Sequence, residues 1–308
     1  MSLGTFRHDA FLYSGAAEFV DTMAAFVDDG LAGGEAVLVA VPGQRSERLR
    51  AALGERAADV CFVDMLEVGR NPGRIIAVWR QFVADRCAGG RPARGVGEPV
   101  WAGRSADELV ECRHHELLLN LAFDPGPPWW LVCPYDVDGL APAVVDEART
   151  THPFVVEGGS RRRSEAYGGW ADATLAEPLP EAPAGAEELA FEGLRLGAAR
   201  ELVARRAAAA GLPRDRAAAL VLAVGELATN SVRHGGGRGV LRVWDGPGTV
   251  VCEVRDGGRL PDPLAGRRLP GPDEESGRGL WLVHQLCDLV QVRSSAGGTT
   301  VRVHVRVP

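Results

Sequence analysis

The apolar side chains of the first half of the chain gather in continuous runs, separated by segments with helical spacing. Residues 36–41 form one such run, and a segment with helical spacing over 16–31 precedes it. Continuous apolar runs are typical of strands buried in a parallel sheet. Further strands are expected over 11–13, 60–63 and 129–133, and further helices over 46–53, 75–87 and 106–123. Alternating strands and helices predict an α/β sheet with helices on both faces.

The second half has a different pattern, in which apolar and polar side chains alternate. Residues 240–244 and 250–254 alternate on either side of the turn-forming residues 245–248, and 289–293 pairs in the same way with 299–307. This pattern predicts β-hairpins with one buried face. Helices are expected over 194–210, 217–234 and 280–289. Because the apolar face of a sheet needs a covering layer, this half is predicted to be a two-layer α/β sandwich.

The composition changes between the two halves. Residues 156–186 contain glycine pairs, an arginine triplet and several prolines, and they lack a periodic apolar pattern. Such a composition is typical of a linker. We therefore expect one domain over 1–155, a linker over 156–186 and a second domain over 187–308, and a length of 308 residues suits two domains.

The charge and the apolar content exclude several classes of protein. The net charge of −7 argues against a general binder of nucleic acid or of anionic membranes. No apolar run reaches the length of about 18 residues that a membrane span needs, and the N-terminus has no signal-peptide pattern. The six cysteines are scattered, without a CxxC pair or a metal-ligand spacing. These features predict a cytoplasmic protein with unpaired thiols.

The predicted helix over 217–234 carries a polar pair in an otherwise apolar register. Glu226 and Asn230 are four residues apart, so their side chains project from one side of the helix. The amide oxygen of Asn230 is a suitable ligand for Mg²⁺, and the carboxylate of Glu226 can take a proton from a hydroxyl group. The pair fits a metal-nucleotide site, and it fits a solvent-exposed face equally well.

A second motif, Asp256-Gly257-Gly258, directly follows a predicted strand. An aspartate at this position can accept a hydrogen bond from the exocyclic amine of adenine. Gly258 has no side chain, so a base can lie against the backbone there. By itself the motif is more typical of an ordinary β-turn.

A third motif, Gly277-Arg278-Gly279-Leu280, opens the last predicted helix. Glycines at the start of a helix let free N–H groups face a phosphate, although a flexible loop before a helix has the same composition. Residues 259–276, which separate the second motif from the third, form a long loop rich in proline, glycine and charge. Long loops inside compact domains are usually functional, and a lid is a common case.

The first half offers one turn at a position that suits ligands. Residues 42–46 lie between a predicted strand and a predicted helix, where a phosphate loop would lie, but they lack the GxxxxGK[ST] pattern. We interpret them as an ordinary strand-to-helix turn. Because ligands favour the carboxyl ends of such strands, the turn can still bind some other ligand.

The helix over 106–123 contains ionisable residues with several interpretations. His115 does not begin an HExxH zinc motif, because Leu119 stands four positions later. Glu111 and His115 can pair with each other, bind a metal, or line a pocket with two aromatic residues, Trp101 and Tyr135. His8 lies alone near the first strand, and a structural role is the simplest interpretation for it.

The order of the three motifs, followed by Gly297-Gly298-Thr299-Thr300 on a predicted strand, resembles the GHKL family of ATPases, named for gyrase, Hsp90, histidine kinases and MutL. The stretches GELATNSVRHG, VRDGG and GRGLWLV resemble the anti-sigma-factor serine kinases of that family in particular. The resemblance covers about 120 residues up to the C-terminus. It implies an α/β sandwich of the Bergerat type that binds ATP together with Mg²⁺.

Carried over to this sequence, the resemblance implies a role for each motif residue. Asn230 would bind Mg²⁺, and Glu226 would act as the catalytic base. Adenine would be contacted by Asp256, Gly258 and either Thr299 or Thr300. The phosphates of ATP would be contacted by Gly277, Arg278, Gly279 and Leu280. The loop over 259–276 lacks a second glycine motif, so kinase activity follows less directly than nucleotide binding.

At the level of function, the resemblance implies a bacterial regulator whose ATP-binding domain sequesters a sigma factor. That domain would phosphorylate a serine or threonine of an anti-sigma-factor antagonist, and the subtype suggests a homodimer. The alternatives are a non-catalytic, ATP-dependent protein-binding switch and a histidine-kinase-like protein. The last of these needs a phosphoacceptor histidine on a helical hairpin, and residues 156–186 contain no histidine.

The first half resembles the methanogen/methylotroph sensory (MEDS) domain. The matching residues are His8, Phe11-Leu12-Tyr13, Val37 to Pro42, Glu111 to Asn120, Leu131, Cys133, Tyr135, Asp136 and His152-Pro153. The resemblance covers about 150 residues. It implies a RecA-like, P-loop-like α/β sandwich without a Walker A motif, which senses a small-molecule ligand without catalysis. Such a domain would control the ATP-binding domain that follows.

Overall fold

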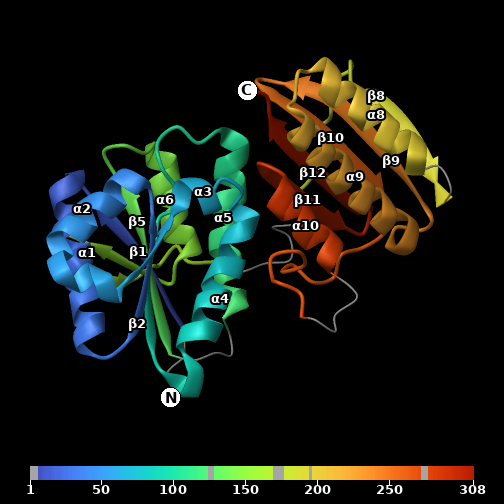
Figure 1. Cartoon of the computed structure of the whole chain (residues 1–308). Helices are drawn as coiled ribbons and strands as arrows, with labels where there is room; N and C mark the ends of the chain where they lie inside the picture. Colours follow the sequence, from blue (N-terminus) through green and yellow to red (C-terminus); the bar gives the residue numbers. More distant parts are fainter. Residues whose placement is uncertain (1–5, 124–127, 169–176, 194–195, 272–276) are drawn as a thin grey trace. The chain divides into compact units, whose positions relative to one another are not determined.

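The computed structural model describes residues 6–123, 128–168, 177–193, 196–271 and 277–308 (Figure 1). The chain divides into two compact units, Met1–Ala171 and Asp172–Pro308. Each unit has its own sheet and its own apolar core, and the predicted α/β fold class is confirmed.

The first unit is built on a seven-stranded sheet with the order β3-β2-β4-β5-β1-β6-β7. The strands are β1 (Phe6–Tyr13), β2 (Ala36–Val41), β3 (Cys61–Asp64), β4 (Ala93–Gly97), β5 (Trp129–Asp136), β6 (Phe154–Glu157) and β7 (Ser160–Arg163). Every neighbouring pair is parallel except β6 and β7. All six residues of β2 are buried, which explains why its sequence is a continuous apolar run.

Helices cover both faces of this sheet, as the apolar pattern predicts. Figure 1 shows α1 and α2 on one side of the strands and α4 and α5 on the other. Helix α1 buries Phe19, Met23 and Val27 in the same cluster as Val37 and Val39 of β2. The helices are α1 (Gly15–Ala32), α2 (Gly43–Leu53), α3 (Met65–Val68), α4 (Ile75–Arg86), α5 (Ala106–Ala122) and α6 (Pro142–Thr151).

The first unit extends further than the sequence pattern predicts. Residues 156–163, expected in the linker, complete β6 and form β7, an antiparallel hairpin at the edge of the sheet. Gly158 and Gly159 both have positive φ, which suits the tight turn between the strands. Arg161 of β7 forms a bidentate ion pair with the buried Asp9 of β1, at 2.6 and 3.0 Å. An arginine of the expected linker is therefore part of the fold. Of that linker, residues 169–176 lie outside the described part of the chain.

The second unit is a five-stranded antiparallel sheet with the order β11-β12-β10-β9-β8 and a helical layer on one face (Figure 1). The strands are β8 (Glu187–Glu192), β9 (Arg238–Gly246), β10 (Thr249–Asp256), β11 (Leu289–Ser295) and β12 (Gly298–Arg306). The helices are α8 (Leu196–Ala209), α9 (Arg214–His234) and α10 (Arg278–Leu286). Residues 194–195, at the expected start of α8, lie outside the described residues. The two-layer sandwich is confirmed.

Helix α9 lies against the sheet through its apolar side. Leu220, Val224 and Leu227 are buried in one cluster with Leu241 and Val254 of the sheet. The helix begins at Arg214 and ends before Gly235, whose N–H donates to the carbonyl of Ser231. Glu226 and Asn230 are only partly buried, so they lie at the margin of the apolar contact.

Two general features of the chain follow from the described residues. Within them, no helix has both the length and the apolar character that a membrane crossing requires. All six cysteines carry free thiols, and five of them are buried. The expectation of unpaired thiols therefore agrees with the structure.

Candidate nucleotide-binding site

Glu226 and Asn230 of α9 lie against the first turn of α10. A Cβ atom added to Gly279 would lie 2.8 Å from Oε2 of Glu226 and 3.3 Å from Nδ2 of Asn230. Only a residue without a side chain allows both polar groups to approach the α10 backbone this closely. Within the described part of the chain, neither side chain has a hydrogen-bond partner, so their polar atoms are available to a ligand. The structure thus brings together the first and the third sequence motif.

The start of α10 has the features of an anion-binding helix end. Gly277, the N-cap residue, has φ of 93°, a left-handed conformation that favours glycine, and it provides no side-chain cap. The first N–H groups of a helix have no partner within the helix, and they carry a partial positive charge. Leu280 is buried in the core, so it anchors this turn and contributes its backbone to the site. This end of α10 is suited to phosphate.

Asp256, the last residue of β10, is held by hydrogen bonds to both of its carboxylate oxygens. Oδ2 accepts a hydrogen bond from the hydroxyl of Ser231 at 2.6 Å, and Oδ1 accepts one from the N–H of Gly258 at 2.8 Å. The hydroxyl of Thr299 donates to the carbonyl of Gly258 at 2.9 Å. Each carboxylate oxygen keeps a further lone pair, so Asp256 can still accept a hydrogen bond from an amine.

Two glycines allow the end of α9 to meet this turn. A Cβ atom on Gly258 would lie 2.5 Å from the carbonyl oxygen of His234, and one on Gly235 would lie 2.4 Å from Cγ of Asp256. No real Cβ atom tolerates such distances from backbone or a fixed carboxylate. The helix that carries Asn230 and the turn that carries Asp256 are therefore in direct contact.

The two threonines of β12 lie on opposite faces of the sheet. Thr299 contacts Gly258, and it shares its face with the core residues Val301 and Val303. Because side chains alternate along a strand, Thr300 lies on the other face with Arg302. Of the two threonines, Thr299 is the one in contact with the turn at Gly258, so the prediction of an adenine contact is better supported for Thr299 than for Thr300.

The predicted lid is only partly described, because residues 272–276 lie outside the described ones. The described part packs on the domain: Gly266 lies against Leu280, and the N–H of Leu260 donates to the hydroxyl of Ser294 at 2.9 Å. Arg278 donates to the carbonyl of Gly271 at 3.3 Å. Arg278 is thus in contact with the predicted lid.

A pocket of about 580 Å³ lies at the ends of β8, β9 and β10. It is lined by Phe191, Arg238 and Arg255, and it shares only Asp256 and Gly257 with the second motif. Glu226 and Asn230 do not line this pocket. We therefore base the candidate site on the contacts around Gly279 and Asp256, and the pocket lies beside it.

A second candidate site lies in the first unit, at the carboxyl ends of its parallel strands. A pocket of about 300 Å³ is lined by residues that include Tyr13, Gln44, Arg45, Trp101 and Asp136. Its position is the turn over 42–46 that sequence analysis leaves open for a ligand. The carboxyl end of a parallel sheet is where such folds bind ligands.

Charged groups converge at this pocket. Arg45 forms ion pairs with Glu98 and with Asp136, and the hydroxyl of Tyr13 donates to Oε1 of Glu98 at 3.2 Å. Burial raises the pKa of Glu98 to about 8, although Arg45 acts in the opposite direction. The second oxygen of Glu98, Oε2, has no hydrogen-bond partner among the described residues. The pocket therefore offers the guanidinium group of Arg45, and behind it lies the buried carboxyl group of Glu98, whose charge depends on pH.

The pocket that sequence analysis assembled from Glu111, His115, Trp101 and Tyr135 does not form. Glu111 and His115 are buried on α5, and Oε1 of Glu111 lies 3.5 Å from the ring of His114. Trp101 lines the 300 Å³ pocket, whereas Tyr135 donates to Glu116 at 3.3 Å. The spacing of Glu111 and His115 predicted that both lie on one face of α5, but it did not predict which residues that face contacts. The helix residue that Tyr135 contacts is Glu116.

Comparisons with known proteins agree with the two units. Residues 7–153 match the family model of the MEDS domain, the methanogen/methylotroph, DcmR sensory domain. Residues 191–305 match the family model of the histidine kinase-like ATPase domain. Among curated proteins, none matches this chain.

One solved structure that is similar to part of this chain is the crystal structure of the RsbU and RsbW domains of Rv1364c from Mycobacterium tuberculosis. The identity is 22%, the match covers 39% of this chain and 32% of that chain, and the TM-score is 0.30. This chain thus spans about a third of that structure. The two family models, with their separate ranges, identify the domains: the chain carries a MEDS sensory domain in its first half and a histidine kinase-like ATPase domain in its second half.

Proposed function

We propose that this protein is a bacterial signalling regulator in which the MEDS domain controls an ATP-binding anti-sigma-factor domain. The second domain sequesters a sigma factor and phosphorylates a serine or threonine of an anti-sigma-factor antagonist. The observation that carries the proposal is the contact of Glu226 and Asn230 with the uncapped start of α10 at Gly279. A carboxylate, an amide and free N–H groups meet there, and this set suits a metal-bound triphosphate.

The two ends of the nucleotide have separate supports. Asp256 would accept the hydrogen bond of the adenine amine, and its two existing hydrogen bonds fix the direction of its carboxylate. Gly277 and Gly279 would hold phosphates at the N-terminus of α10, where the helix dipole favours negative charge. Arg278 would approach the terminal phosphate from the side of the lid, where it contacts Gly271.

Mg²⁺ and Glu226 have distinct tasks in this proposal. The amide oxygen of Asn230 would hold Mg²⁺, which neutralises phosphate charge when bound. The carboxylate of Glu226 would take the proton of the serine or threonine hydroxyl that attacks the terminal phosphate. Catalysis then consists of positioning and charge neutralisation, the usual contributions in phosphoryl transfer.

The MEDS domain would sense a small molecule in the 300 Å³ pocket. The combination of Arg45, Asp136 and Tyr13 suits a small polar ligand, and the aromatic ring of Trp101 adds an apolar wall. A ligand with an anionic group would compete with Asp136 and Glu98 for Arg45. The pocket thus supplies a charge pair that a ligand can rearrange.

The decisive experiment measures nucleotide binding and phosphotransfer with the full chain. Isothermal titration with Mg-ATP should give binding for the natural protein and a loss of at least tenfold for Asn230→Ala. Asp245→Ala is the matched control, because Asp245 is an exposed side chain paired with Arg206. Unchanged affinity in Asn230→Ala would refute the metal assignment.

Proteins captured from the native cytoplasm with Mg-ATP then serve as substrates for radiolabelled ATP. Label on a captured antagonist supports the kinase. Capture that depends on ATP without transfer of label supports the non-catalytic switch.

A further inference from the structure

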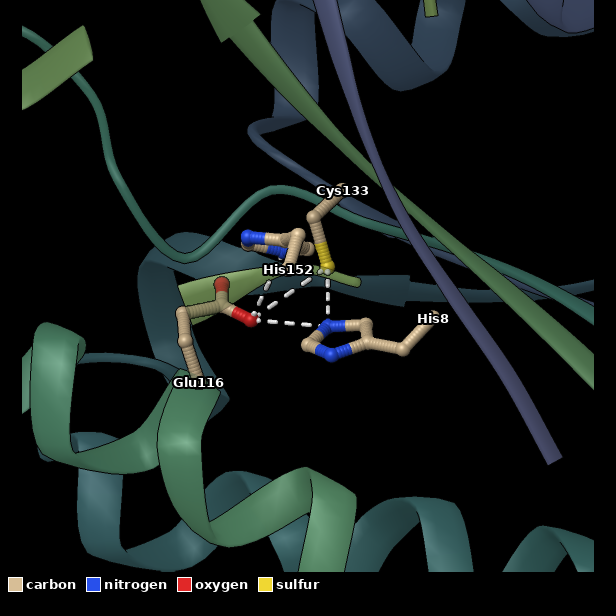
Figure 2. A group of neighbouring side chains, drawn as sticks. All are labelled: His8, Glu116, Cys133 and His152. Carbon is tan, nitrogen blue, oxygen red and sulfur yellow. Dashed lines mark hydrogen bonds and ion pairs between the residues drawn. The ribbon is translucent and has the colours of Figure 1, made fainter. Parts of the chain in front are cut away.

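Four ionisable side chains meet inside the first unit, away from the pocket at Arg45. They are His8 of β1, Glu116 of α5, Cys133 of β5 and His152, which follows α6 (Figure 2). All four are buried, and none is more than 2% exposed. One ligand atom from each lies within 4.8 Å of all the others. Two nitrogens, an oxygen and a sulfur therefore converge on one point of the core.

The distances match those between the ligands of a small metal ion. Oε2 of Glu116 lies 3.0 Å from Nε2 of His8, 3.3 Å from Nε2 of His152 and 3.5 Å from Sγ of Cys133. Nε2 of His8 lies 3.4 Å from Sγ of Cys133. Tetrahedral zinc, with bonds of about 2.0–2.3 Å, requires ligand–ligand distances of roughly 3.3–3.6 Å. The four distances from Glu116 and His8 are close to those values without any rearrangement.

Hydrogen bonds assign the proton of the His8 ring. The amide nitrogen of Asn120 donates to the carbonyls of Glu116 and Thr151, at 3.2 and 3.0 Å. The amide oxygen of Asn120 therefore faces Nδ1 of His8, at 3.1 Å, and only an N–H can meet it. In the neutral ring, Nε2 of His8 then presents a lone pair to the cluster (Figure 2).

His152 and Glu116 are oriented in a similar way. Nδ1 of His152 lies 2.8 Å from the carbonyl of Ala148, which accepts its hydrogen and leaves a lone pair on Nε2. The second carboxylate oxygen of Glu116 accepts a hydrogen bond from Tyr135 at 3.3 Å. Metal-binding histidines and carboxylates are typically oriented by such outer contacts.

The charges of the cluster are suited to a bound divalent ion. Two nitrogen lone pairs directed at a carboxylate oxygen repel it unless a positive charge lies between them. A divalent ion bound by Glu116, the Cys133 thiolate and two neutral imidazoles gives zero net charge, which suits a site without water. Protonating both rings beside one carboxylate would instead leave one uncompensated charge in the core.

We propose that His8, Glu116, Cys133 and His152 bind one divalent transition-metal ion of the zinc type in a closed, four-coordinate site. Nitrogen, sulfur and carboxylate ligands in tetrahedral arrangement are characteristic of zinc. Binding forms four bonds to the metal, and the proton of the Cys133 thiol leaves to solvent. The site joins β1, β5, α5 and the segment after α6, so the metal stabilises the MEDS domain. It does not depend on nucleotide binding by the second domain.

The test uses the full chain, reduced and stripped of metal by a chelator, to which Co²⁺ is added as a spectroscopic substitute for zinc. We expect one equivalent to bind, with the visible bands of tetrahedral cobalt and a near-ultraviolet thiolate-to-cobalt band. Cys133→Ser should lose the thiolate band and bind Co²⁺ at least tenfold more weakly. Cys112→Ser is the matched control, because this buried thiol on α5 lies outside the cluster and donates its hydrogen bond to the carbonyl of Pro99, so this variant should keep both bands.

A second measurement protects the test against a variant that does not fold. X-ray absorption at the zinc edge of the natural, zinc-loaded chain should give one sulfur and three nitrogen or oxygen neighbours. Zinc should also raise the melting temperature of the stripped chain. A folded chain that takes up neither Zn²⁺ nor Co²⁺ in equimolar amount refutes the proposal, as does a zinc shell without sulfur.

Discussion

Ser231 donates its hydroxyl hydrogen to Oδ2 of Asp256 across 2.6 Å, and this bond ties helix α9 to the end of strand β10. Ser231 directly follows Asn230, the proposed metal ligand, so one helical turn positions both ends of the proposed nucleotide site. Ser231 lies on the buried side of α9 and is fully buried. Its hydrogen bond to Asp256 could not be predicted from the sequence, because it depends on the position of β10 next to α9.

Removing this hydroxyl tests the link. Ser231→Ala leaves the partly buried carboxylate of Asp256 with one partner fewer, so we expect a loss of about 1–2 kcal/mol in unfolding free energy. Mg-ATP affinity should fall several-fold, because the carboxylate loses its fixed direction. Thr229→Val is the control: the Thr229 hydroxyl donates to the carbonyl of Gly225 in its own helix, so ATP affinity should not change. Equal affinities in both variants would contradict the link.

A single methyl group at Gly279 should damage the phosphate end. Its Cβ would lie 2.8 Å from Oε2 of Glu226, so Gly279→Ala must displace Glu226 or the first turn of α10. We expect a loss of at least tenfold in Mg-ATP affinity by titration calorimetry, with little change in melting temperature. Gly197→Ala on α8 is the matched control, because nothing lies within 4 Å of its added methyl group. Normal ATP binding by Gly279→Ala would argue against the site.

Substitutions at Glu226 and Asn230 should affect phosphotransfer and Mg-ATP binding differently. Glu226→Gln keeps the size of the side chain and removes the base, so Mg-ATP affinity should stay within about twofold while phosphotransfer falls by roughly 10²-fold or more. Asn230→Ala should lose both. Transfer of label from radioactive ATP to a captured antagonist measures the rate. A Glu226→Gln protein that transfers phosphate at the natural rate would exclude Glu226 as the base.

Glu98 should make the first unit less stable as pH rises. Burial raises its pKa from 4.5 to about 8, so the folded protein binds this proton more tightly than the unfolded chain does. Stability from this group is therefore full below the unfolded value and declines as pH rises from about 4.5 to 8. The decline is on the order of a few kcal/mol.

The check compares melting curves of the natural chain and Glu98→Gln at several pH values. The difference between them should shrink or reverse towards low pH, because the natural side chain is then neutral like the amide. Glu47→Gln, an exposed position on α2, should follow the natural profile. A difference that is constant with pH would show that Glu98 ionises normally.

Arg161 should contribute to the stability of the first unit. Its partner Asp9 is completely buried, and Arg161→Ala leaves that carboxylate with the indole N–H of Trp130 as its remaining side-chain contact. Because a buried charge loses its counterion, we expect a loss of about 3 kcal/mol in unfolding free energy. Arg162→Ala, an exposed neighbour paired with Glu157, should cost about 0.5 kcal/mol or less. Equal losses in urea unfolding would contradict the assignment.

The strongest elements of the fold could be predicted because one residue pattern determined them. The run over 36–41 is strand β2, since both of its faces are buried, and the alternating runs around 245–248 are β9 and β10. Strands β8 and β7 escaped prediction because they are edge strands rich in charge. Glu188 of β8 pairs with Arg242 of β9, and Arg161 of β7 with Asp9, so tertiary ion pairs replace an apolar pattern there.

Some residues of the candidate sites could likewise be predicted from the sequence, and others could not. Asp256, Gly258, Gly277 and Gly279 could be proposed from the sequence because each lies at the end of a strand or helix. The choice between Thr299 and Thr300 needed the face of β12, which the sequence alone did not give. The metal cluster escaped because its ligands come from four separate segments, with no short spacing to connect them. The one available signal was that His8, Cys133 and His152 all lie among the residues that resemble the MEDS domain.

The neighbours His8 and Asp9 give strand β1 two different attachments. Successive side chains of a strand point to opposite faces, so His8 joins the buried cluster while Asp9 is bound by Arg161 of β7. Strand β7 is the last strand of the sensory domain before the chain continues to the ATPase domain. Strand β1 therefore holds the proposed metal cluster through His8 and the last strand of this domain through Asp9, so both attachments depend on the position of one strand.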